Sequence, residues 1–111
     1  MKSSDWMARF QAELQKAEDA RLAGNEGMAR VCARRAAGLA AGEYLSRQGM
    51  LPHDPSAYAR LKYLRSLPDI PQEVRAVTDH FLLRITPDHS LPVEADLIAE
   101  ARWLVKELLG V

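Results

Sequence analysis

The chain has 111 residues, of which 48% are hydrophobic and 27% charged, and its formal net charge at pH 7 is zero. This length and composition predict one globular domain over residues 1–111, and the zero net charge excludes the overall basic character of many nucleic-acid-binding proteins. A single cysteine excludes an intrachain disulfide, and no apolar run approaches the roughly 20 residues that a membrane-spanning helix needs. We therefore expect a cytoplasmic protein with no membrane partner.

The first half of the sequence predicts two long helices. Apolar side chains at Trp6, Phe10 and Leu14 recur at helical spacing and indicate a helix over residues 5–23. A second helix is expected over residues 26–48, where Asn25 is the predicted cap and Gly49 the predicted stop.

The middle of this second helix, ARRAAGLAAGEYL, is rich in alanine and glycine. A glycine in a helix interior costs about 1 kcal/mol, so Gly38 and Gly42 indicate a neighbouring helix that approaches closely.

The second half predicts three further helices, each opened by a proline. Asp54 and Pro55 are a suitable cap and first-turn pair for a short helix ending near residue 66. Pro71 opens a helix expected to reach residue 85, and Pro92 opens one expected to reach residue 109. Five helices with short connections predict an all-α, up-and-down bundle.

The stretch VRAVTDHF, residues 74–81, carries the main functional candidates. A helix turns by 100° per residue, so Arg75 and His80 flank the apolar stripe centred on Phe81 and lie about 140° apart. Both are expected to face water, a ligand or another chain. The alternative is an ordinary solvated face in which Arg75 pairs with Asp79 one turn later.

Helix 26–48 supplies further candidates for binding a nucleic acid or nucleotide. Arg35 falls on the same face as apolar residues, where a charge must be paired or must reach a cleft. Glu43 lies two turns further on, and a polar Arg35–Glu43 cluster is the structural alternative. Arg30 and Arg34 could contact phosphates, or form a solvated face.

Three residues predict a dimer or partner surface. Leu83 lies in the polar face of helix 71–85, with Arg84 beside it, and Trp103 lies opposite the apolar stripe of the last helix. An exposed tryptophan often marks a contact.

The three histidines, His53, His80 and His89, lack metal-ligand spacing, and no second cysteine is present, so no metal site is predicted. No glycine-rich phosphate loop is present, and no cofactor is expected. Cys32, among apolar neighbours in mid-helix, is expected to be a small core residue.

In helix order and length the chain resembles HEPN domains, the higher-eukaryote and prokaryote nucleotide-binding helical bundles. The segment GNEGMARVCARRAAGLAAGEYLSRQG resembles the family's second helix, and the region from VRAVTDHF to DLIAEARWLVKEL resembles its last two. Arg75 and His80 match the R-x4-6-H motif of family members that are metal-independent ribonucleases.

The resemblance implies RNA binding, and either of two functions. In the first, a toxin-like ribonuclease acts as a homodimer, Arg75 holding phosphate and His80 transferring protons. In the second, a non-catalytic module binds a nucleotide or a partner protein. A cognate antitoxin or a nucleotidyltransferase-like protein is the partner that the resemblance suggests.

Overall fold

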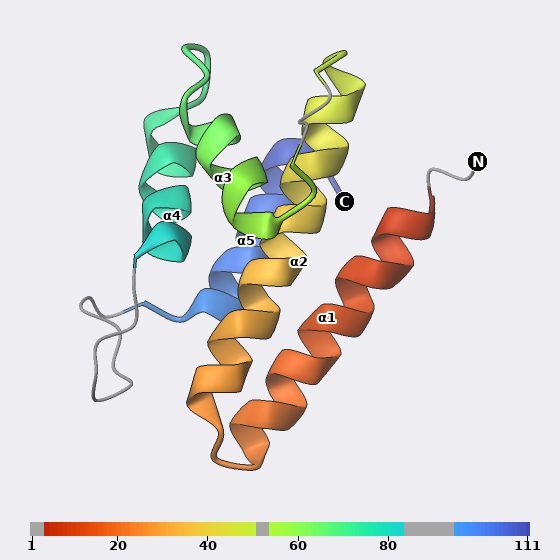
Figure 1. Cartoon of the computed structure of the whole chain (residues 1–111), viewed down its shortest axis with the longest axis vertical. Helices are drawn as coiled ribbons and strands as arrows, with labels where there is room; N and C mark the ends of the chain where they lie inside the picture. Colours follow the sequence, from red (N-terminus) through yellow and green to blue (C-terminus); the bar gives the residue numbers. More distant parts are fainter. Residues whose placement is uncertain (1–3, 51–53, 84–94) are drawn as a thin grey trace.

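The computed structural model describes residues 4–50, 54–83 and 95–111, and these residues form five α-helices and no strand. The helices are α1 (Ser4–Leu22), α2 (Glu26–Arg47), α3 (Ala57–Arg65), α4 (Gln72–Leu82) and α5 (Leu97–Leu109). Helices α1 and α2 form an antiparallel hairpin, while α3 and α4 form a second hairpin beside α2 (Figure 1). The predicted all-α bundle is confirmed.

Helix α2 is the centre of the bundle, since it packs against α1, α3 and α5. Most of its buried residues are small: Ala29, Cys32, Ala33, Ala36, Ala37, Gly38, Ala40, Ala41 and Leu45. Large side chains come from its neighbours, including Phe10 of α1, Leu61 and Leu64 of α3, and Leu104 of α5. Small residues on one helix let large residues on three others fill the space around it.

Helices α2 and α3 approach each other closely at Gly38 and Ala57. A Cβ atom added at Gly38 would lie 2.4 Å from Ala57 Cβ and 2.6 Å from Ala57 Cα. The backbone of α3 therefore occupies the volume that any larger residue would need, which confirms that Gly38 has a packing purpose.

Several helix ends agree with the sequence-based predictions. The Asn25 side chain accepts a hydrogen bond from the Met28 backbone N–H at 3.1 Å, which caps α2. Beyond α2 and α5, Gly49 and Gly110 adopt positive φ angles of 77° and 73°, the left-handed conformation that glycine adopts without steric cost.

Three helix boundaries differ from the predictions. Helix α3 is capped by Ser56, because the Asp54 carboxylate instead accepts from the Ser56 N–H at 2.9 Å. Helix α4 ends at Leu82, after which Leu83 is extended. Helix α5 begins at Leu97, because the Asp96 side chain accepts from the N–H of Ala99 and caps it there. At the starts of α3 and α5, local side-chain caps thus override the proline signals.

Within the three described ranges, no helix has the length and apolar character required to cross a membrane.

We expect Gly38→Ala to lower the free energy of unfolding by about 1–3 kcal/mol, because the new methyl group overlaps the backbone of α3. Gly27→Ala is the matched control on the same helix. Its Cβ would meet only Asn25 Oδ1 at 3.9 Å, and the change should stabilise the protein by roughly 0.5–1 kcal/mol. Urea unfolding followed by circular dichroism measures both. Equal effects of the two substitutions would contradict the close α2–α3 approach.

Candidate functional site

Helix α4 presents the two residues of the predicted motif to different neighbours. Val74, Thr78 and Phe81 are buried and fix which face of α4 meets the bundle. Arg75 and His80 are half-buried on the two flanks of that face. Arg75 reaches α3 and His80 reaches α5. The two side chains therefore do not converge within one chain.

The guanidinium of Arg75 binds the carboxyl end of α3. Its Nε donates to the carbonyl oxygen of Arg65 at 3.2 Å, and its Nη2 donates to that of Leu67 at 2.8 Å. A cation is favourable there because the last carbonyls of a helix lack intrahelical donors and carry partial negative charge. The expected Arg75–Asp79 pair is absent from the described contacts, because Asp79 pairs with Arg65 across the α3–α4 hairpin.

His80 forms the principal polar contact between α4 and α5. Its Nδ1 lies 2.9 Å and 3.0 Å from the two carboxylate oxygens of Glu100. A carboxylate only accepts hydrogen bonds, so Nδ1 carries the proton and Nε2 is the lone-pair nitrogen of the neutral ring. The His80 side chain is 30% exposed. A histidine oriented in this way can take a proton from a group that approaches Nε2.

Glu100 was not predicted from the sequence. It lies in the first turn of α5, where an acidic residue also suits the positive end of the helix dipole. Its position 20 residues after His80, across a connection between helices, leaves no local signal of the contact.

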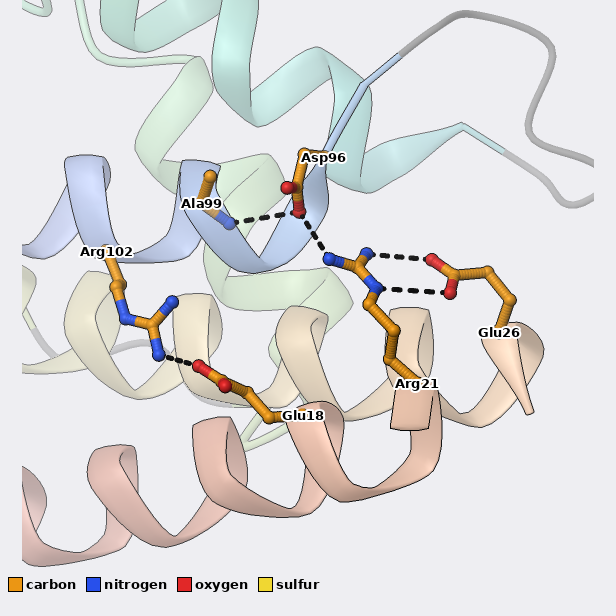
Figure 2. Close-up of polar contacts among 6 residues, drawn as sticks. All are labelled: Glu18, Arg21, Glu26, Asp96, Ala99 and Arg102. Atoms are coloured by element: carbon orange, nitrogen blue, oxygen red, sulfur yellow. Dashed lines mark hydrogen bonds and ion pairs between the residues drawn. The ribbon is translucent and has the colours of Figure 1, made fainter. Parts of the chain in front are cut away.

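A polar network holds the start of α5, the turn that carries Glu100 (Figure 2). Arg21, at the end of α1, donates to Asp96 at 3.0 Å and to both carboxylate oxygens of Glu26 at 2.8 Å and 3.1 Å. Asp96 also caps α5 through the N–H of Ala99 at 3.2 Å. One arginine thereby joins α1, α2 and the start of α5.

A second ion pair, Arg102 with Glu18, joins α1 to α5 further along (Figure 2). Two separate bridges of this kind restrict rotation of α5 about its own axis, and hence the direction in which Glu100 points.

Hydrogen bonding sets the acidity of Asp96. Burial acts to raise its pKa, but the hydrogen bonds from Arg21 and from the Ala99 N–H outweigh that effect and lower the pKa below its ordinary value. The hydrogen bond to Glu26, followed by the contact with Asp96, raises the pKa of Arg21.

The candidates on α2 separate into different roles. Arg35 is exposed and lines a cleft between α1, α2 and α3, as its position on an apolar face predicted. The alternative of an Arg35–Glu43 cluster is wrong, because Glu43 pairs with Arg47 at 3.0 Å. Arg34 is half-buried and donates from Nε to the carbonyl oxygen of Phe81 at 3.1 Å, near the end of α4. Arg30 is half-buried and interacts with other groups.

The expected partner surface is less exposed than predicted. Trp103 is half-buried, and although its position is opposite the apolar stripe of α5, its side chain packs against the hydrophobic core. Leu83 is half-buried and lies just beyond the end of α4. Arg84 lies outside the described residues. A partner surface at Leu83 and Trp103 stays a prediction.

Among the described residues, no group of three or more histidine, cysteine, aspartate or glutamate side chains is arranged to hold a metal ion. His53 and His89 lie outside those residues. Cys32 is buried, and burial, followed by the charge of Glu13, raises the pKa of its thiol. The thiol is therefore held in its less nucleophilic, protonated form.

Compared with known proteins, the chain matches no family model, no curated protein and no solved structure.

We expect Arg75→Ala to lower the free energy of unfolding by about 1–3 kcal/mol, because two carbonyls at the end of α3 lose a charged donor. Glu73→Ala, an exposed change on the same helix, should have an effect within about 0.5 kcal/mol. Urea unfolding of both variants is the measurement. An Arg75→Ala protein as stable as the control would show that these hydrogen bonds do not hold α4.

Asp96→Asn tests the network at the start of α5, since asparagine still caps a helix but cannot pair with Arg21 as an ion. Because folding lowers the pKa of Asp96, its ionised form adds stability that is complete above the ordinary aspartate value of about 3.9. That stability disappears as the pH falls through the lower pKa of the folded state. Thermal unfolding should therefore show wild type more stable by roughly 0.5–1 kcal/mol at pH 7, as for other exposed pairs, with the difference shrinking as the pH falls below about 3.9. A difference independent of pH would contradict the ion pair.

Proposed function

We propose that this chain is an RNA-binding protein of the HEPN type that cleaves RNA without a metal ion, with His80 as the general base. The observation that supports this proposal is the hydrogen bond from His80 Nδ1 to Glu100. It fixes the tautomer that places the basic nitrogen, Nε2, on the other side of the ring. A carboxylate behind a histidine also stabilises the ring once it has accepted a proton.

In the proposed reaction, Nε2 removes the proton of a ribose 2′-hydroxyl. The 2′ oxygen then forms a bond to the adjacent phosphorus, while the bond from phosphorus to the 5′ oxygen breaks. The 5′ oxygen takes a proton from water or from a second acid. The products are a 2′,3′-cyclic phosphate and a free 5′-hydroxyl, so no metal and no oxidant or reductant is consumed.

Arg75 enters this proposal in two ways. The carbonyls of α3 use two of its five N–H donors, which positions α4 and leaves further donors for a phosphate oxygen. Because Arg75 and His80 reach towards different helices, we propose that a homodimer brings Arg75 of one copy to His80 of the other.

A second candidate function is non-catalytic binding of a nucleotide or a partner protein. The observation that favours it is the engagement of Arg75 with α3, since a structural role already accounts for the motif arginine.

The deciding experiment is cleavage of several RNAs in EDTA by the purified protein, with analysis of the 3′ ends. Wild type should release 2′,3′-cyclic phosphates, and His80→Ala should lower the rate by at least about 100-fold, the usual contribution of a general base. Glu100→Gln should lower the cleavage rate by less than His80→Ala and should alter its pH dependence, because the His80 ring loses its ionic partner.

Glu107→Gln is the matched control, since it makes the same change as Glu100→Gln at an exposed position of α5 outside the site. Absence of cleavage by wild type on every RNA would overturn the ribonuclease proposal and leave the binding module. A monomer by light scattering at micromolar concentration would remove the composite Arg75–His80 site.

A further inference from the structure

A cleft of about 360 Å³ lies between α1, α2 and α3, and neither Arg75, His80 nor Glu100 lines it. In Figure 1, α1 and α3 both lie against α2. Gly38 and Ala57, the residues of the close α2–α3 approach, both belong to the lining of the cleft. The helices converge there, so the cleft is a pocket at a crossing.

Four cationic side chains line this cleft: Arg9 and Lys16 from α1, Arg35 from α2 and Arg60 from α3. Among the described residues of the lining, Glu13 is the one that is acidic. Cations from three different helices therefore gather around one carboxylate, although the chain as a whole has no net charge. Like charges brought this close repel each other unless an anion lies among them.

The pairing of the arginines singles out the same cleft. Seven of the ten arginines in the described ranges interact with other groups, six of them through the hydrogen bonds and ion pairs given above. The remaining three, Arg9, Arg35 and Arg60, make no hydrogen bond or ion pair with a described residue, and all three line the cleft. The unpaired arginines are thus not scattered over the surface.

Two buried atoms at the cleft also lack partners among the described residues. The Nε of Arg60 is a buried donor without an acceptor, and Oε1 of Glu13 is a buried acceptor without a donor. The other carboxylate oxygen of Glu13 lies 3.7 Å from Lys16 Nζ, a loose contact on a lysine that is 63% exposed. Glu13 therefore offsets part of the positive charge without forming tight bonds to the arginines.

We propose that this cleft binds a small molecule through a phosphate group that carries two or more negative charges. Arginine matches phosphate by donating parallel hydrogen bonds, and four cations against one carboxylate suit a dianion better than a monoanion. The volume is at the lower end of the range for small-ligand pockets, about 300–1,000 Å³. An RNA strand carries one charge per phosphate and follows an extended basic track, whereas these cations, from three helices, line a single cleft. The inference is independent of RNA cleavage at His80.

Isothermal titration calorimetry with inorganic pyrophosphate and with ribose 5-phosphate tests the proposal, with ribose as the uncharged control. Both phosphates should bind wild type and ribose should not. Arg35→Gln and Arg60→Gln should each weaken binding by at least about tenfold, the cost of losing one charge-assisted contact. Arg47→Gln is the matched control, because it removes the same charge from α2 outside the cleft, and it should leave the affinity within about twofold.

Glu13→Gln provides a test in the opposite direction. Removal of the single carboxylate from a cationic cleft should strengthen binding of both phosphates several-fold. Circular dichroism confirms that each variant is folded, and Arg35→Gln should be well tolerated since Arg35 is exposed and makes no described hydrogen bond.

Three results would overturn the proposal. The first is no binding of either phosphate at millimolar concentration. The second is an equal loss of affinity in Arg35→Gln and Arg47→Gln, which would indicate general charge attraction. The third is binding of an RNA oligonucleotide without terminal phosphates that Arg35→Gln and Arg60→Gln weaken as strongly as they weaken pyrophosphate binding. Loss of RNA cleavage in His80→Ala, with pyrophosphate binding unchanged, would separate this site from the proposed catalytic one.

Discussion

The architecture depends on how closely α1, α3 and α5 can approach α2. Alanine and glycine on α2 contribute little buried apolar area themselves, so the stabilising side chains are the leucines and aromatics that the neighbours place against it. At Gly38 the approach is so close that one methyl group has no room. At Gly42 the neighbour is instead the Arg60 side chain, which lies 2.8 Å from where a Cβ would be. The two glycines thus set the crossing of α3 and the position of a cleft arginine.

Polar contacts at helix ends then fix how α3, α4 and α5 lie against their neighbours. Arg75 binds the last carbonyls of α3, Arg34 binds a carbonyl near the end of α4, and Arg21 holds the cap of α5. Each of these arginines places its guanidinium beside carbonyl or carboxylate oxygens at a helix end, and one guanidinium can donate to two acceptors at once. A lysine has the same charge but lacks this fork, so it would satisfy fewer of these acceptors.

The periodicity of the sequence was sufficient to predict those features that depend on residues close together in the chain. The order of the helices, the Asn25 cap and the left-handed conformation of Gly110 follow from helix propensity and capping preferences. The glycine at position 38 correctly predicted a close helix approach. Partner choice was not predictable in the same way. Asp79 had Arg75 one turn away on its own helix, yet it pairs with Arg65, because Arg75 has a better-placed set of acceptors on α3. Glu100 and the cleft residues Arg9 and Arg60 become neighbours of their sites only through tertiary packing.

Helix α3 connects the two candidate sites physically. Its Arg60 side chain lies in the cationic cleft, while the carbonyls at and beyond its carboxyl end, at Arg65 and Leu67, hold Arg75 and hence α4 with His80. A dianion bound by Arg9, Arg35 and Arg60 would contact α1, α2 and α3 together and would reduce the repulsion among the three arginines. His80 instead lies between α4 and α5. Because α3 is short and is packed against α2 at Gly38, displacement of one of its ends without the other would require a change at that crossing. The α2–α3 approach therefore governs both the shape of the cleft and the support on which His80 rests.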